Sequence, residues 1–365
     1  MKAKPDIKET KQRFEAWWNG NLNEAPLLTL IEILDEPKSG SKFEPAGEYP
    51  EITDLYLNYK GRIADFRNRL NFVNYLADSY PSLSLDLGPG SMALYLGSDP
   101  IFSRETVWYS DVVKNTWKDY PLKFDPENKW WKLHLEMIRN AHDAAGGEFY
   151  VNIPDIIENM DILAAMRGPQ ASCFDLVDEP EIIHERLNEL DELYFKYYDA
   201  MYDIVKDDEN FSSFTAFHVL GPGKTGKVQC DFAAMLSPEM FKEFIVPSLN
   251  YQCSRLNQSI FHLDGPDCIR HIPALMSVES LKALQWTPGE GKPDGGDERW
   301  FPIYDKVREA GKSLWIHVDG DADEMIGKAR KLVKRYGINA LYVLMAGVRS
   351  DGAQKVLKEY AKGFK

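Results

Sequence analysis

The sequence predicts an α/β fold: a (β/α)8 barrel, or TIM barrel, of residues 81–365 preceded by a mainly helical N-terminal extension of residues 1–80. From residue 82 onward, short apolar runs alternate with segments of helical periodicity, which is typical of parallel βαβ units. The chain has 365 residues, enough for the roughly 250 of such a barrel. An open doubly wound sheet shows the same alternation and remains the alternative, because strand order is not visible in a sequence.

The N-terminal extension contains one strand candidate among helical segments. An apolar run at 26–33 predicts a strand that could join the barrel, and a loop rich in Pro and Gly follows it to about residue 50. Residues 62–79 carry apolar side chains at helical spacing and predict a helix.

The remaining strands are predicted from apolar runs that lie between helical patterns, at 82–87, 148–154, 213–220, 259–264, 281–286, 313–318 and 340–345. Start and stop signals mark several of the helices between them. Asp178 with Pro180 and Ser237 with Pro238 are typical of helix N-termini, and Gly337 ends a helix that begins near Asp323.

Composition narrows the classes of function. The net charge of −14 opposes binding to nucleic acid or to anionic lipid. No apolar run approaches the roughly 18 residues of a membrane helix, and the first residues lack the apolar stretch of a secretory signal. Four scattered cysteines fit a reducing compartment, so we expect a cytoplasmic protein that acts on a small molecule.

The segment from Gly221 to Val228 satisfies the first seven positions of a phosphate-binding P-loop. Val228 stands where the motif needs a Ser or Thr hydroxyl for Mg²⁺, and no helix is expected directly after Lys227. We therefore interpret this segment as a mobile loop over the barrel mouth rather than a nucleotide site.

His262 and Asp264 end the apolar run at 259–264 and, being two residues apart on a strand, point to the same face. Both are metal ligands of the kind that zinc accepts, and Cys230 or His317 could supply a third. A histidine hydrogen-bonded to Asp264 without any metal is the alternative. Cys230 has its own alternative, since most cysteines are small buried hydrophobes.

Further candidates lie near the expected rim of the barrel, where the carboxyl ends of strands carry reactive residues. Asp86 precedes a tight Gly-Pro-Gly turn that would expose it. The remaining candidates are expected to bind substrate: Asp155, Asn159, Asp231 and Trp286. Asp155 or Asn159 could instead cap the following helix.

The stretch Gln229-Cys230-Asp231-Phe232, the run from Leu236 to Pro247, and Phe261-His262-Leu263-Asp264-Gly265 resemble the uroporphyrinogen decarboxylase superfamily. That superfamily also contains cobamide-dependent methyltransferases, and the resemblance spans about residues 80–360. It implies a (β/α)8 barrel with its site at the carboxyl face. In the methyltransferases a His-x-Cys pair binds zinc, so His262 matches the histidine while Asp264 replaces the cysteine.

The resemblance implies, as the first hypothesis, a methyltransferase that moves a methyl group between a small methylated compound or thiol and a corrinoid protein. His262, Asp264 and Cys230 would hold zinc, and His317 and Asp86 would carry protons. Trp286 would wall the pocket and could face a quaternary ammonium substrate. The corrinoid would belong to the partner protein only.

Two alternatives remain open from the sequence. The first is cofactor-free decarboxylation in porphyrin biosynthesis, in which Asp86 matches the catalytic acid of the decarboxylases. Those enzymes grip substrate carboxylates with an Arg-rich N-terminal segment, whereas Arg13 is the only arginine before Arg62 here. The second alternative is a non-catalytic binding barrel.

Overall fold

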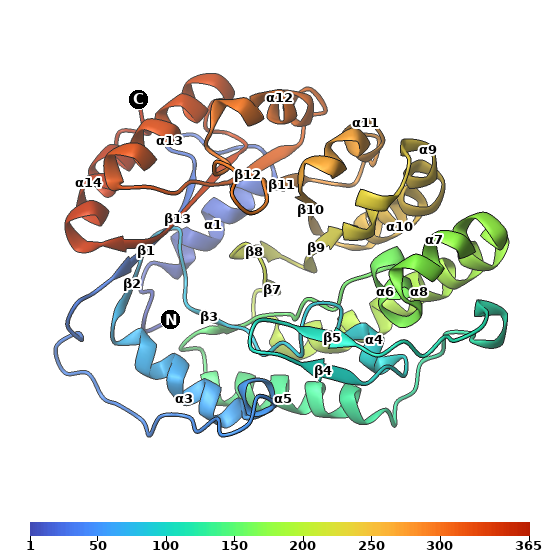
Figure 1. Ribbon diagram of the computed structural model, residues 1–365. Coiled ribbons are helices and arrows are strands. Elements are labelled where there is room, and N and C mark those ends of the chain that lie inside the picture. Colours follow the sequence, from blue (N-terminus) through green and yellow to red (C-terminus); the bar gives the residue numbers. More distant parts are fainter.

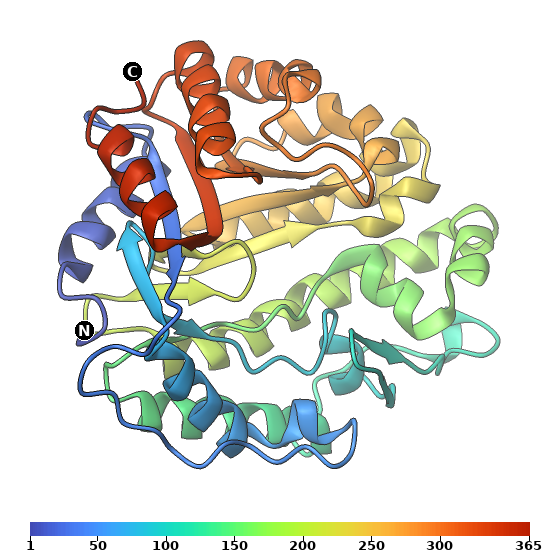
Figure 2. The same cartoon turned by 60° about the vertical axis from the view of Figure 1, so that its left-hand side comes forward.

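The computed structural model describes residues 1–365 and has a mixed α/β fold around a large, mostly parallel sheet (Figures 1 and 2). The sheet order is β2-β1-β13-β12-β11-β10-β9, and every neighbouring pair is parallel except β1 with β2. The seven strands are β1 (Leu27–Ile33), β2 (Val73–Ala77), β9 (Thr225–Gln229), β10 (Gln258–Asp264), β11 (Ala283–Thr287), β12 (Ser313–His317) and β13 (Leu341–Arg349).

Three further pairs of strands lie outside this sheet. They are parallel β3 (Ser82–Leu83) with β6 (Tyr150–Val151), antiparallel β4 (Pro100–Phe102) with β5 (Val107–Tyr109), and antiparallel β7 (Phe211–Phe214) with β8 (Val219–Pro222). The amide of Ile153 donates to Ser213 O at 2.8 Å, which links the chain after β6 to β7. The strand ladders do not run continuously around a ring, so the structure supports the α/β class without showing a closed eight-stranded barrel.

Helices cover the outside of the sheet, with α12 packed on β12, α13 on β13, and α14 on β1 and β13 (Figure 2). The predicted helix signals at Pro180, Ser237 and Gly337 are confirmed, and the Ser237 hydroxyl accepts from the Met240 amide. The predicted cap at Asp178 is wrong, because Asp178 is the last residue of α7 and Glu179 precedes α8. The helices are α1 (Ile7–Trp18), α2 (Asp54–Leu57), α3 (Tyr59–Leu70), α4 (Met92–Tyr95), α5 (Lys129–Ala145), α6 (Asn159–Arg167), α7 (Pro169–Asp178), α8 (Pro180–Val205), α9 (Pro238–Met240), α10 (Val246–Arg255), α11 (Ile272–Met276), α12 (Phe301–Glu309), α13 (Ala322–Tyr336) and α14 (Ser350–Tyr360). No helix combines the length and apolar character that crossing a membrane requires.

Three sequence predictions of secondary structure are wrong in part. The helix predicted at 62–79 ends at Leu70, and β2 follows it. The single strand predicted at 213–220 is the hairpin of β7 and β8, whose turn places Phe217 and His218 at positive φ. The predicted mobile loop contains β9, whose five residues are all buried. Its polar residues face other polar groups in the interior, and an apolar-pattern search does not recognise such a strand.

The N-terminal segment shares its core with the rest of the chain. β1 lies between β2 and β13 in the central sheet, and rings of α1 contact β13. Trp17 lies 5.3 Å from Tyr342 between ring centroids, and the Trp18 indole donates to Leu220 O at 2.9 Å. A domain boundary at residue 80 stays a prediction, and the pairing of β1 with β13 connects the segments on its two sides.

Candidate metal and substrate site

Strand register assembles one row of interior side chains across five neighbouring strands. Gln229 pairs with His262, His262 with Gln285, Gln285 with Trp315, and Trp315 with Tyr342. Directly paired residues of parallel strands project to the same face of the sheet. A second row lies two residues nearer the carboxyl ends of these strands, with Asp231, Asp264, Thr287 and His317.

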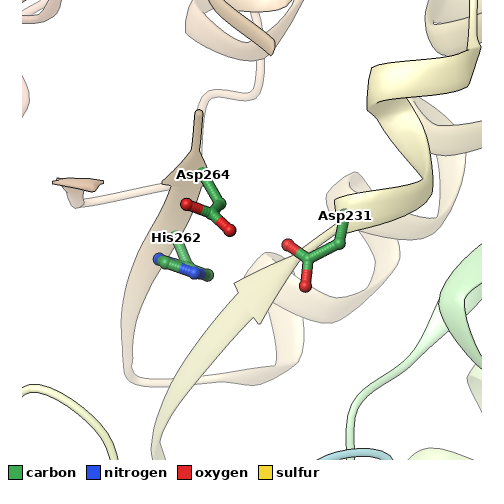
Figure 3. A group of neighbouring side chains, drawn as sticks. All are labelled: Asp231, His262 and Asp264. Carbon is green, nitrogen blue, oxygen red and sulfur yellow. The ribbon is translucent and has the colours of Figure 1, made fainter. Parts of the chain in front are cut away.

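Three side chains of these rows meet at the ends of β9 and β10: Asp231, His262 and Asp264 (Figure 3). One ligand atom from each lies within 4.8 Å of the other two. Catalytic zinc sites use three protein ligands of His, Asp, Glu or Cys and keep a fourth position open. The donor set of one imidazole and two carboxylates fits that pattern, and this trio is the candidate metal group.

Cys230 does not belong to the candidate metal group, so its predicted place is taken by Asp231. The cysteine is extended and buried, between residues whose side chains face the interior rows. Its thiol is not among the ligand atoms that lie within 4.8 Å of one another, although Cys230 lines a small pocket with Cys268 next to the group. Burial raises the pKa of the Cys230 thiol well above its usual value, which suits a small hydrophobe rather than a thiolate ligand.

The imidazole of His262 is oriented by an amide chain. Gln285 Nε2 donates to Thr287 Oγ1 at 2.8 Å, which directs Gln285 Oε1 toward His262 Nδ1. In this orientation Nδ1 carries the hydrogen, and Nε2 keeps its lone pair for a metal or a proton. Burial and the nearby Lys227 ammonium lower the pKa of His262, which favours the neutral ligand form.

Asp231 is held from its backbone and from its side chain. Asp161 accepts from the amides of Asp231 at 2.9 Å and Phe232 at 2.8 Å. Gln229 Nε2 donates to Asp231 Oδ2 at 3.1 Å and to Asp161 Oδ2 at 2.9 Å. The surrounding protein and the charge of Asp161 raise the pKa of Asp231 to about 7, and Lys227 opposes this shift. Binding of a cation at the candidate metal group is therefore favoured.

Lys227 is a buried cation beneath the candidate metal group. It is 3% exposed, and its ammonium contacts Asp155 Oδ2 at 2.5 Å and Gln229 Oε1. Glu158 lies nearby, also buried, and its Oε1 accepts from the Gln229 amide at 2.6 Å. Burial raises the pKa of Glu158 well above its usual value. Lys227 thus offsets the negative charge of Asp155, Glu158 and Asp231.

Two residues predicted to bind substrate instead support β9. Asn159 is fully buried with φ +47°, and its Nδ2 donates to Gln229 O at 2.6 Å. Asp155 forms the ion pair with Lys227. The described contacts therefore use both side chains to position the strand that leads to Asp231.

Asp86 lies near Asp155 but outside the candidate metal group. Its Oδ2 accepts from Thr215 Oγ1 at 2.9 Å, and its Oδ1 accepts from the Asp155 amide at 3.3 Å. Burial raises the pKa of Asp86, and the Arg62 guanidinium opposes the shift. Asp86 is therefore an interior acid that holds a proton more readily than an exposed aspartate does.

His317 and Trp286, both predicted from strand ends, differ in burial. His317 Nε2 is 3.1 Å from Asp319 Oδ1, at a cavity of about 420 Å³ that Gln285 and Trp315 also line. The indole of Trp286 is 1% exposed and packs on Trp300 at 5.2 Å between ring centroids. Trp286 is thus a mostly buried member of the lining of this cavity, and its neighbour Gln285 belongs to the interior row.

The sequence reasoning missed several interior residues, namely Lys227, Gln229, Gln285, Phe217 and Trp315. A signal was available for two of them, because Lys227 and Gln229 alternate with Gly226 and Val228 as a strand requires. Phe217 gave no such signal, since it lies in the turn between β7 and β8.

The chain matches no family model, and no curated protein matches its sequence. Among solved structures it is similar to a methyltransferase from Methanosarcina mazei, with a TM-score of 0.63 and 12% identity over 97% of this chain and 98% of that one. A likeness to a GH138 enzyme targeting pectin rhamnogalacturonan II has a TM-score of 0.40 and 14% identity over 94% of this chain and 39% of that one, too low to indicate a common fold. The chain thus shares an α/β fold with a methyltransferase over almost its whole length.

Proposed function

We propose that the protein is a zinc-dependent methyltransferase that moves a methyl group between a small methylated compound or thiol and a separate corrinoid protein. The observation that carries the proposal is the meeting of Asp231, His262 and Asp264 at the carboxyl ends of adjacent strands. The fold likeness to a methyltransferase supports the reaction class. The corrinoid partner rests on the sequence resemblance described above.

One imidazole and two carboxylates form a ligand set that zinc accepts. These ligands are harder than the thiolates of cysteine. Bound zinc supplies a Lewis acid that activates a nucleophilic group such as a thiol. The chain itself prepares the ligands. Gln285 and Thr287 fix the imidazole of His262, and Gln229 with Asp161 fixes the carboxylate of Asp231. Lys227 limits the mutual repulsion of the acids.

Methyl transfer requires a nucleophile to give an electron pair to the methyl carbon while the leaving atom keeps the pair of the broken bond. A thiol must lose its proton before it becomes such a nucleophile. His317, beside Asp319 at the wall of the cavity, is positioned to take that proton and pass it to solvent. Asp86 lies deeper, where Thr215 and the Asp155 amide orient it as a second proton carrier.

Porphyrinogen decarboxylation is the less favoured alternative because the interior is acidic. Arg62 donates to Ser84 O at 2.8 Å and to Tyr56 O at 3.2 Å, so backbone carbonyls already engage its guanidinium. An octacarboxylate substrate would meet Asp231, Asp264 and Asp155, while the cavity lining offers a single lysine, Lys292, and no arginine. Formation of coproporphyrinogen from the octacarboxylate by purified protein would replace our proposal with this one.

Zinc affinity of matched variants tests the proposal. We expect stoichiometric zinc in protein purified without chelator, and at least about a tenfold loss of affinity in Asp231→Ala. Gln285→Ala should lose about 10- to 100-fold because it orients a ligand without being one. Cys230→Ser is the control, since its thiol is not among the clustered ligand atoms and zinc affinity should not change.

Methyl transfer from a methylated corrinoid to a thiol is the activity to measure with these variants. His262→Ala should abolish it, and Cys230→Ser should retain it. Absence of zinc in the wild-type protein, or equal methyl transfer by wild type and His262→Ala, contradicts the proposal. If every interior variant changes only stability, the non-catalytic barrel is the better description.

A further inference from the structure

A cavity with an aromatic corner lies beside the candidate metal group. It has a volume of about 420 Å³ and includes Phe217, Trp315 and His317 in its lining. The Phe217 ring lies 5.2 Å from both the Trp315 and the His262 rings, between centroids. The aromatic corner therefore lies between the cavity and His262. A small molecule held in the cavity extends close to the candidate metal group.

Hydrogen bonds hold this corner in place. The Trp315 indole donates to Phe217 O at 2.8 Å, and Tyr342 Oη donates to His218 O at 2.8 Å. Phe217 and His218 have φ values of +65° and +47°, a conformation that is unfavourable for residues other than glycine. The interior row thus fixes a strained turn in the arrangement that presents the Phe217 ring.

The charge around the cavity is negative. Asp319 and Glu290 are exposed at its lining, whereas the charges of Asp231 and Asp264 beside His262 are offset by Lys227 and, when bound, by zinc. Asp294 is neutralised by Lys328, which leaves Lys292 as the only lysine or arginine in the lining. A cationic ligand is favoured by this balance, and an anionic one is opposed.

Most polar side chains that line the cavity already have partners. Gln285 is engaged by His262 and Thr287, and His317 is paired with Asp319. A ligand that needs several new hydrogen bonds would have to break these contacts. A fully methylated ammonium group needs none, and it is attracted to aromatic faces through cation–π interactions.

We propose that this cavity binds the methylated ammonium group of a small substrate, with Phe217 and Trp315 as aromatic walls and Asp319 as counter-charge. The assignment as substrate rests on the proposed methyltransferase function, whereas the binding site itself does not. When a nucleophile attacks a methyl carbon, the C–N electron pair stays on nitrogen. The product is a neutral tertiary amine, and no proton has to be supplied. The acceptor is the reduced corrinoid or thiolate of the proposed reaction.

Trp286 also lines this cavity, as the sequence predicts, but its side chain is 1% exposed and its ring packs on Trp300. The main aromatic contacts for a quaternary ammonium therefore come from Trp315 on the next strand and from Phe217 in the β7–β8 turn. This difference provides a control, since Trp286 and Trp315 are both nearly buried tryptophans on neighbouring strands.

Calorimetric titration with choline and with 3,3-dimethylbutan-1-ol tests the proposal, because the alcohol is a neutral carbon analogue of nearly the same shape. We expect choline to bind at least about tenfold more tightly than the alcohol. Phe217→Leu and Asp319→Asn should each weaken choline binding by about three- to tenfold. Asp319 is exposed, so its variant should fold even if a change at Trp315 does not. Trp286→Phe should change choline binding less than Phe217→Leu does, because the Trp286 ring is buried against Trp300.

Equal binding of the two ligands, or choline binding that Phe217→Leu and Asp319→Asn leave unchanged, overturns the proposal. The titration is made with zinc-free and zinc-loaded protein so that two failures can be told apart. Zinc bound without choline recognition leaves the methyltransferase proposal standing and refutes this one. Choline recognition without zinc binding supports the ammonium site and refutes the proposed zinc chemistry.

Discussion

Replacing Lys227 by methionine should destabilise the protein strongly, because it removes a buried ammonium and keeps its acidic partners. Lys227 is 3% exposed, and the Asp155 side chain that it contacts is 14% exposed. The second oxygen of Asp155 is buried without a hydrogen-bond partner. Methionine fills a similar volume but offers no charge, so Asp155 and the Gln229 amide oxygen both lose a donor.

Removing one partner of a buried ion pair typically costs about 3–5 kcal/mol, and we expect a loss in this range for Lys227→Met. Urea unfolding followed by tryptophan fluorescence measures it, with chelator present so that metal binding does not contribute. Lys355→Met is the matched control. Its pair with Asp323 is exposed at 51% and 74%, and its loss should cost less than about 1 kcal/mol.

A double variant isolates the charge. Lys227→Met combined with Asp155→Asn removes both ions, so it should recover a substantial part of the stability that Lys227→Met loses. A loss for Lys227→Met no larger than that of Lys355→Met would refute the reasoning. So would a double variant less stable than Lys227→Met alone, because unpaired charge would then not be the cause.

Three further outcomes follow from the described contacts. Burial raises the pKa of Asp191 to about 7, so between about pH 4 and 7 the folded state keeps a proton that the unfolded state loses, and stability falls as the pH rises. In urea unfolding, Asp191→Asn should remove up to about 1.4 kcal/mol of this loss per pH unit. An unchanged dependence of stability on pH would contradict this prediction. Trp286→Ala should cost about 3–5 kcal/mol in thermal or urea unfolding yet leave zinc affinity unchanged, and a specific loss of zinc would place its ring at the site after all. Gly88→Ala should lower the melting temperature, because φ is +90° and the added Cβ would lie 2.5 Å from Val107 Cβ; a melting temperature equal to wild type would show that the turn adapts.

The sequence predicts the strands whose interiors are apolar and fails where the interior is polar. The runs at 259–264, 281–286 and 313–318 correspond to β10, β11 and β12 within two residues. The segment of β9 is predicted as a mobile loop because it matches an incomplete phosphate-binding motif rich in glycine, and its polar residues Lys227 and Gln229 hide the strand. They are buried because each has a partner across the interior, and no local pattern reveals partners that lie about 70 residues away.

The errors among the predicted site residues concern which alternate residues of each strand face the interior. Cys230 was predicted as a ligand and Asp231 as a substrate contact, whereas Asp231 joins the candidate metal group. Trp286 is predicted to wall the pocket and does line it, but its side chain is buried, and its neighbour Gln285 contacts His262. A shift by one residue exchanges the two faces of a strand, so the location along the chain was predictable and the facing side was not. His262 and Asp264 were assigned together because their spacing of two does not depend on phase.

The pairing of β1 with β13 has a consequence for how the molecule forms. Leu27 pairs with Tyr342, so the parallel partner of the first strand is synthesised more than 300 residues later. Contacts between residues so distant in sequence slow folding, because a large loop must close before they form. During synthesis β1 has only its antiparallel neighbour β2, and its other edge stays unpaired. We therefore expect nascent chains that lack the last strand to be prone to aggregation or chaperone binding.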